Sequence, residues 1–191
     1  MRVILALVAC LSLAGCWVSE QRLFGAGDWA HLELDGRYKS ENANGDPQAS
    51  VVLHSRPDGL VEGTSESLDD GTTELSVFGF VRIEDGSGQY FLMVDRTKDN
   101  DSGDIYFIAR LNPGGTLEIY WPDCGGTPAR SGMAVESGGL GDTDVCTFSS
   151  KEALMSAALE AERFLSAKHI VEVSPMGRMV PDDDQAEGVD E

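Results

Sequence analysis

The stretch Thr73-Glu74-Leu75-Ser76-Val77-Phe78-Gly79-Phe80-Val81-Arg82-Ile83 decides the fold class. Apolar and polar side chains alternate along most of it, which is the period of two that a half-buried β-strand shows. Gly79 interrupts this alternation between two phenylalanines, and a glycine inside a strand often marks a kink or bulge. The sequence therefore predicts a strand over residues 73–83, with an irregularity at Gly79.

Three more alternating runs follow this strand, at residues 89–94, 105–111 and 117–121. The segments between them are rich in Gly, Asp, Asn and Pro, which are turn and loop residues. Four consecutive strands with short connections are typical of an antiparallel meander, which can bury one face and expose the other.

Residues upstream extend the predicted sheet. Short strand-like runs lie at residues 36–40, 50–54 and 60–63, and Pro57-Asp58-Gly59 separates the last two. Proline presets φ and glycine accepts positive φ, so this tripeptide predicts the turn of a hairpin. The expected fold class is mainly β: a single domain over residues 36–174, with a meander that closes into a small barrel or a sandwich.

One helix is predicted after the strands, at about residues 150–166. Ser149 and Glu152 fit a capping box at its start. Apolar residues then recur with helical spacing on one stripe, at Leu154, Ala157, Ala158, Ala161, Phe164 and Leu165. We expect the helix to pack on the sheet or to close one end of a barrel, and residues 170–173 to return as a last strand.

The N-terminus has the composition of a secretory signal. Arg2 precedes a run of about ten apolar residues, too short for a transmembrane helix of about 20 residues. The run ends in Leu13-Ala14-Gly15-Cys16. This tetrapeptide resembles the lipobox of bacterial lipoproteins, and the resemblance covers the first 16 residues or so.

The resemblance implies that residues 1–15 are a signal peptide cut between Gly15 and Cys16. It also implies that the Cys16 thiol is diacylated and that the new amino terminus is acylated. Each buried methylene contributes about 0.8 kcal/mol, so several chains make a stable membrane anchor. Trp17 follows the cysteine, instead of the Asp that retains many such lipoproteins in the inner membrane of enteric bacteria. The expected location is the cell envelope, at the outer membrane facing the periplasm more than at the inner membrane. The alternative is an ordinary signal peptide with a cysteine near the cut.

The net charge limits the possible partners, and the length limits the domain organisation. Lys and Arg number 14 against 33 Asp and Glu, which gives a net charge of −19. Nucleic acid and anionic lipid surfaces need a basic footprint, so we expect no nucleic-acid partner. The domain is expected to follow a lipidated tether over residues 16–35 that lies against it. It precedes an acidic tail over residues 175–191, predicted to be disordered.

Cys124 and Cys146 are predicted to form a disulfide. Cys10 would leave with the signal peptide and Cys16 would carry lipid, so these are the two thiols left in an oxidising compartment. A metal site is the alternative, but the chain has no CxxC pair and no His near either cysteine. Residues 125–144, rich in Gly, Ser and Thr, are predicted to be a long loop within the bridge.

Recognisable catalytic or metal motifs are lacking. Residues 63–67 begin like a nucleophile elbow without its second glycine, and we interpret them as a turn or loop. Residues 99–104 resemble the opening of a calcium loop, but the glycine is one position early. His31, His54 and His169 have no metal-binding spacing. The sequence therefore predicts no catalytic residue, no metal and no cofactor.

Three functional hypotheses follow. The favoured one is a membrane-anchored, non-catalytic binding or structural module, whose partner is an envelope protein or another envelope component. The second is a carrier that holds a small apolar ligand in a β-barrel cavity. The third is an enzyme without a recognisable motif.

Overall fold

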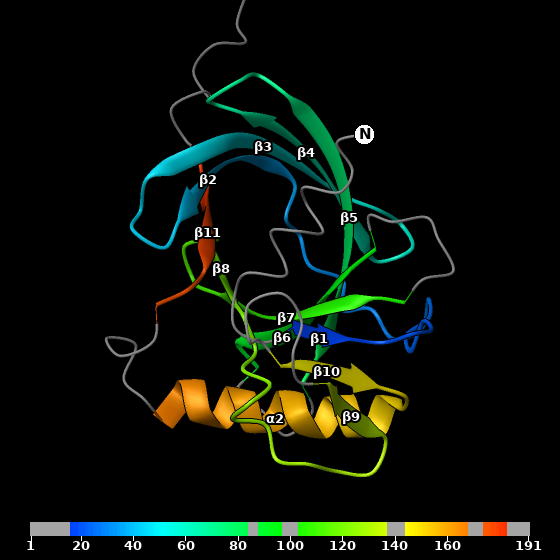
Figure 1. Cartoon of the computed structure of the whole chain (residues 1–191). Helices are drawn as coiled ribbons and strands as arrows, with labels where there is room; N and C mark the ends of the chain where they lie inside the picture. The colour runs from blue at the N-terminus through cyan, green and yellow to red at the C-terminus, as the bar shows by residue number, and fades with distance from the viewer. Residues whose placement is uncertain (1–15, 84–87, 97–102, 137–143, 168–173, 183–191) are drawn as a thin grey trace, which may run out of the picture.

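A closed antiparallel barrel of eight strands is the centre of the fold (Figure 1). The computed structural model describes residues 16–83, 88–96, 103–136, 144–167 and 174–182. The barrel strands are β2 (Gly36–Asn42), β3 (Pro47–Ser55), β4 (Leu60–Ser67), β5 (Thr73–Arg82), β6 (Tyr90–Asp95), β7 (Ile105–Leu111), β8 (Leu117–Tyr120) and β11 (Gly177–Pro181). The predicted mainly β fold class is confirmed. Of the two predicted alternatives, a small barrel or a sandwich, the structure shows the barrel.

Strand β11 closes the barrel between β2 and β8. Met179 pairs with Ser40 on one side and with Leu117 on the other. The predicted disordered tail was therefore wrong over residues 177–181, because two open strand edges recruit a segment whose own composition carries no strand period. The last strand predicted at residues 170–173 and the tail from residue 183 lie outside the described residues.

Gly79 serves packing and not a bulge. The pairing of β5 with β4 and with β6 runs through Gly79 without a shift. A Cβ at this position would lie 2.5 Å from carbons of the Trp29 ring. The glycine thus leaves room for the indole, and the predicted irregularity was wrong. The register does shift elsewhere, in β2 between Ser40 and Glu41.

A cluster of buried apolar side chains packs inside the barrel. Phe80 contacts Phe78 and Phe91 edge to face, with ring centroids 6.3 and 6.4 Å apart. The other buried members of this cluster come from all parts of the barrel wall and from the segment before β2: Ala30, Leu34, Tyr38, Val51, Leu53, Val61, Met93, Ala109 and Leu117.

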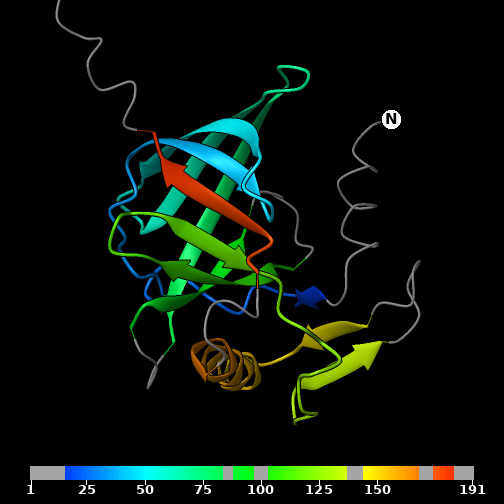
Figure 2. The ribbon, with the colours of Figure 1, turned by 90° about the vertical axis from the view of Figure 1, so that its left-hand side faces the viewer.

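A second core lies outside the barrel. The helix α2 (Lys151–Ala167) and the strands β1 (Cys16–Val18), β9 (Met133–Glu136) and β10 (Val145–Phe148) lie beneath the barrel in Figure 2. Strand β1 is antiparallel to β7 and parallel to β10. Its Trp17 is 1% exposed and packs on Phe148, with ring centroids 5.3 Å apart.

Helix α2 begins one residue later than its predicted cap implies. The Ser150 hydroxyl accepts a hydrogen bond from the Ala153 amide at 3.2 Å, so Ser150 is the N-cap. The Ser149 hydroxyl instead donates to the Gly132 carbonyl oxygen. The predicted apolar stripe of α2 differs from the observed buried face at two positions. Phe164, a member of the predicted stripe, is 52% exposed, and Glu162, which was not part of it, is buried.

The segment before β2 packs on the domain, as predicted. Phe24, Trp29 and Leu34 are buried. The Arg96 guanidinium lies 4.6 Å from the centroid of the Trp29 ring, a cation–π geometry. Asp28 forms a salt bridge with Lys151 at the start of α2. Residues 16–18 are not a free tether, because they form strand β1.

Replacing Ala157 with Asp should lower the free energy of unfolding by about 2 kcal/mol or more, since the change buries an unpaired charge. Ala157 is 1% exposed on the face of α2 that meets the barrel. Arg163→Asp, on the exposed face of the same helix, is the control. Denaturant unfolding measures both variants, and equal stability of the two would show that Ala157 does not face the core.

Asp28→Asn should destabilise the protein more at pH 7 than at pH 3. The Lys151 ammonium and the Gly25 amide hold the pKa of Asp28 below its usual range. The ionised carboxylate therefore stabilises the fold above about pH 3.9, the ordinary Asp pKa, and this contribution is lost as the pH falls through the lowered value. Thermal melts of both proteins at the two pH values test this, and a pH-independent difference would contradict it.

Candidate functional site

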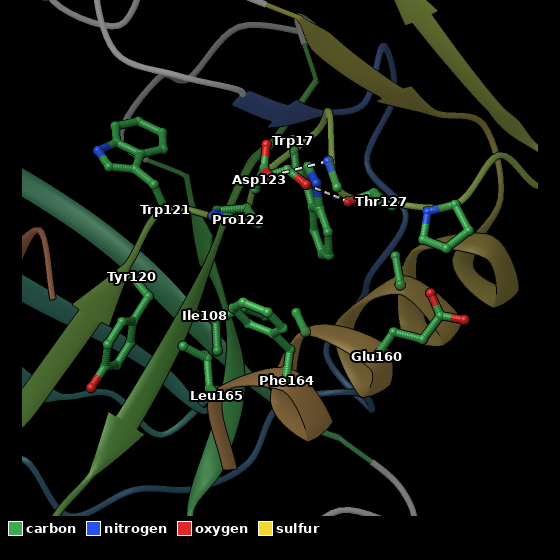
Figure 3. A pocket seen from close by; sticks show the side chains of 14 residues that line it. Trp17, Ile108, Tyr120, Trp121, Pro122, Asp123, Thr127, Glu160, Phe164 and Leu165 are labelled. Carbon is green, nitrogen blue, oxygen red and sulfur yellow. Dashed lines mark hydrogen bonds between the residues drawn. The ribbon is translucent and has the colours of Figure 1, made fainter. Parts of the chain in front are cut away.

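An apolar cleft of about 230 Å³ lies outside the barrel, between α2 and the loop after β8 (Figure 3). Its lining comes from β1, β7, β8, the loop and the helix: Trp17, Ile108, Tyr120, Trp121, Pro122, Asp123, Gly126, Thr127, Pro128, Ala157, Glu160, Ala161, Phe164 and Leu165. None of these residues had been proposed as a site from the sequence.

The helical wall of the cleft combines small and large side chains. Ala157 and Ala161 are one turn apart, and both line the cleft. Phe164 lies farther along the helix and is half exposed. Because the two alanines are small and the Phe164 ring is large, the face of α2 has a recess at Ala157 and Ala161.

Trp17 enters the cleft from β1 (Figure 3). Its side chain is almost completely buried. The indole N–H has no hydrogen-bond partner among the described residues. A buried donor without an acceptor is costly, so this N–H is a local cost of burying Trp17.

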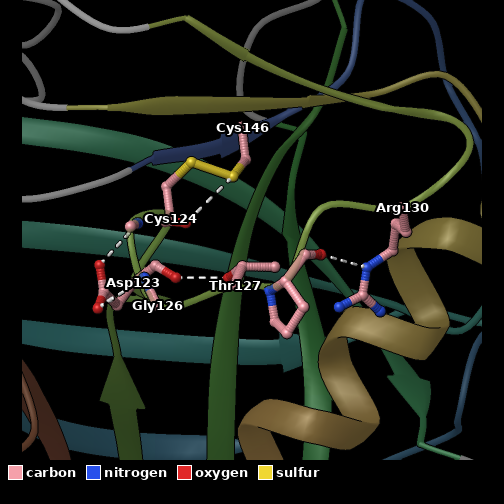
Figure 4. Close-up of a disulfide and its surroundings, with 8 residues drawn as sticks. Asp123, Cys124, Gly126, Thr127, Arg130 and Cys146 are labelled. Carbon is pink, nitrogen blue, oxygen red and sulfur yellow. Dashed lines mark hydrogen bonds between the residues drawn. A yellow bond between two sulfur atoms is a disulfide. The ribbon is translucent and has the colours of Figure 1, made fainter.

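The loop wall is held by its own hydrogen bonds (Figure 4). The Asp123 carboxylate accepts from the amides of Gly125 and Gly126, at 3.0 and 3.1 Å. The Thr127 hydroxyl donates to the Asp123 carbonyl oxygen. A Cβ on Gly126 would lie 2.7 Å from the Asp123 carboxylate, so a side chain here would displace that carboxylate from its present position.

Arg130 fastens this loop to α2. Its Nε donates to the Pro128 carbonyl oxygen at 3.1 Å, and one Nη donates to the Ser156 hydroxyl at 2.9 Å. The other Nη forms a salt bridge with Glu160 at 2.6 Å. The guanidinium thus spans the gap between the two walls and fixes the width of the cleft. Ser156 and Glu160 are 26 and 30 residues from Arg130 in the sequence, so local residue spacing did not predict these contacts.

The predicted disulfide joins Cys124 to Cys146, with Cα atoms 5.6 Å apart (Figure 4). Both residues are buried. Cys146 lies in β10 directly opposite Trp17. The bridge therefore ties the loop wall to the strand beside the Trp17 wall, and in this form the two sulfurs are bonded to each other and not to a metal.

Cys16, the predicted lipid-attachment residue, is the first residue of β1 and pairs with Val145. Gly15 and the rest of the predicted signal peptide lie outside the described residues. Within the described part of the chain, no helix has both the length and the apolar character needed to cross a membrane.

Buried polar groups gather at a second place, between β7 and the segment after β1. The Ser19 and Tyr106 hydroxyls are 2.7 Å apart, and Arg96 is 3.4 Å from Asp104. Burial raises the pKa of Asp104 above its usual range. None of these four residues lines the cleft. The Ser19 hydroxyl joins the N-terminal segment to the barrel through Tyr106.

The other sequence motifs do not converge on a site. Residues 63–67 lie within strand β4, so their interpretation as a turn or loop was wrong. His54 pairs with Asp35 at 3.0 Å on the surface, and His169 lies outside the described residues. Among the residues that the structure describes, no three His, Cys, Asp or Glu side chains are grouped to hold a metal ion.

Comparison of this chain with protein-family models, with curated proteins and with solved structures found no match.

Replacing both Cys124 and Cys146 with Ala should lower stability by about 2–4 kcal/mol while the fold is retained, because the bridge closes a long loop in the unfolded chain. Denaturant unfolding gives the stability, and circular dichroism checks the fold. Alkylation of the native wild-type protein is the control. Two reactive thiols in that control would contradict the bridge and reopen the metal alternative.

Proposed function

We propose that this protein is a lipid-anchored module of the bacterial envelope, without catalytic activity, and that it binds an apolar envelope component in the cleft between α2 and the loop at residues 121–128. The lipobox-like tetrapeptide ending in Cys16 supports the anchor. Acyl chains on Cys16 attach the protein to a membrane, and the outer membrane facing the periplasm is the favoured location.

The observation that carries the binding proposal is the apolar cleft with its braced walls. Its loop wall is fixed by the disulfide and by the turn at Asp123, and its helical wall by the salt bridge between Arg130 and Glu160. A site whose walls are already in place loses little conformational freedom when it is filled, which favours binding.

The other two hypotheses have less support. A carrier would need an enclosed apolar cavity in the barrel, but the rings of Phe78, Phe80 and Phe91 pack against one another there. A hollow of about 390 Å³ beside Leu34, Tyr38 and Phe91 is open and is lined also by polar residues such as Gln89 and Asn112. An enzyme would need an accessible cluster of reactive groups. The buried group around Ser19 and Asp104 does not line the cleft, and the polar residues of the cleft are engaged in holding its walls.

Cys16→Ser should abolish lipid attachment and leave the signal peptide uncut, because the acylated sulfur is lost. Metabolic labelling with a fatty acid measures the attachment, and the mass of the purified chain reports the cut. Cys124→Ala with Cys146→Ala is the control that keeps Cys16 and should still carry label. Label that persists on the Cys16→Ser variant would refute the anchor.

A further inference from the structure

The open hollow of about 390 Å³ lies at the end of the barrel where β2 begins. Leu34 and Phe91 of the barrel core line its inner part, and the more exposed Glu33 and Asn112 lie at its rim. It shares no lining residue with the cleft beside α2. Small-molecule sites occur at the mouths of β-barrels, with volumes of about 300–1,000 Å³. The hollow is therefore a second candidate ligand site.

Tyr38 brings a hydroxyl without a partner to this hollow. The side chain lines the hollow, and the residue is only 6% exposed. Among the described residues none forms a hydrogen bond with this hydroxyl, and its oxygen is not one of the fully enclosed atoms that lack a partner. The oxygen is therefore accessible at the hollow that the side chain lines. Burial and the nearby Asp35 carboxylate raise the pKa of Tyr38, so the hydroxyl stays protonated and can both donate and accept.

Asn112 supplies a second such group from the turn between β7 and β8. Its backbone is fixed, because its N–H donates to the Thr116 carbonyl oxygen and its carbonyl oxygen accepts from the Gly115 amide, both at 2.9 Å. Its side-chain amide has no hydrogen-bond partner in the described part of the chain. A side-chain amide, like a hydroxyl, both donates and accepts. Tyr38 and Asn112 thus offer two groups that pair well with the hydroxyls of a ligand.

The remaining lining of the hollow limits the class of ligand. Glu33 is the one charged side chain among the described lining residues, so an anionic ligand finds no cation there. A purely apolar ligand would leave the Tyr38 hydroxyl and the Asn112 amide without partners, which is costly. A sugar meets both requirements, because its hydroxyls serve these two groups and its C–H face can pack on the Phe91 ring.

We propose that this hollow is a binding site for a neutral saccharide, whose hydroxyls hydrogen-bond to Tyr38 and Asn112 and whose apolar ring face lies against Phe91 and Leu111. The site is separate from the cleft, so it depends neither on the lipid anchor nor on the binding function proposed above. Its ligand is polar, and so differs from the small apolar ligand of the carrier hypothesis.

The test uses the complete protein, produced in cells and purified in a detergent without a sugar headgroup. Isothermal titration calorimetry measures the binding of two neutral trisaccharides, chitotriose and maltotriose. Tyr38→Phe removes the hydroxyl and keeps the ring, and Asn112→Ala removes the amide. The matched control is Tyr106→Phe, because Tyr106 is also a buried tyrosine of the barrel wall but lines neither the hollow nor the cleft. Circular dichroism checks that each variant is folded.

The expected result is binding of at least one neutral trisaccharide, weakened about five- to tenfold by Tyr38→Phe and by Asn112→Ala and unchanged by Tyr106→Phe. Trimers of galacturonic acid and of glucosamine, which carry negative and positive charges, should bind more weakly. No binding of either neutral trisaccharide at millimolar concentration would refute the proposal. Tighter binding of a charged trimer would overturn the ligand class, and binding unchanged by Tyr38→Phe would show that the sugar does not occupy this hollow.

Discussion

The burial of Trp17 is the interaction on which the parts outside the barrel depend. Strand β1 is only three residues long, yet it joins β7 of the barrel to β10 and so continues the barrel wall into a small additional sheet. The indole contacts Phe148 and lines the cleft beneath α2. Without this side chain, the core shared by α2, β10 and the outer face of the barrel would lose its largest buried ring.

Most of the barrel could be predicted from the sequence because its strands show alternating apolar and polar residues within their own segments. Alternation within β5, β6 and β7 and the glycine-containing turns between strands are local properties. Strand β11 is different, because its state is decided by the free edges of β2 and β8. The sequence of residues 177–181 alone gives no indication that β2 and β8 both have unpaired edges next to this segment.

The site was less accessible to sequence reasoning for a similar reason. The disulfide followed from counting cysteines in an oxidising compartment, but the cleft arises where a loop and a helix meet. Phe164 had the spacing of a core residue but lies at an exposed position on the rim of the cleft. Glu162 shows the converse case, a charged residue that the helix buries. A weak signal for Arg130 existed, as a lone basic residue in an otherwise small and polar loop.

The parallel pairing of β1 with β10 has a consequence for the order in which the chain assembles. Residues 16–18 are inserted between strands that lie about a hundred residues later in the sequence. A chain that crosses a membrane with its N-terminus first delivers β1 long before β7 and β10 arrive. In the proposed export, Cys16 and Trp17 stay unpaired during most of the passage, and the proposed lipidation of Cys16 then takes place on an extended peptide and not on a folded sheet. The pairing of β1 with β7 and β10, which buries Trp17, is then a late step in folding. The fold can be completed only after the C-terminal half of the chain is present.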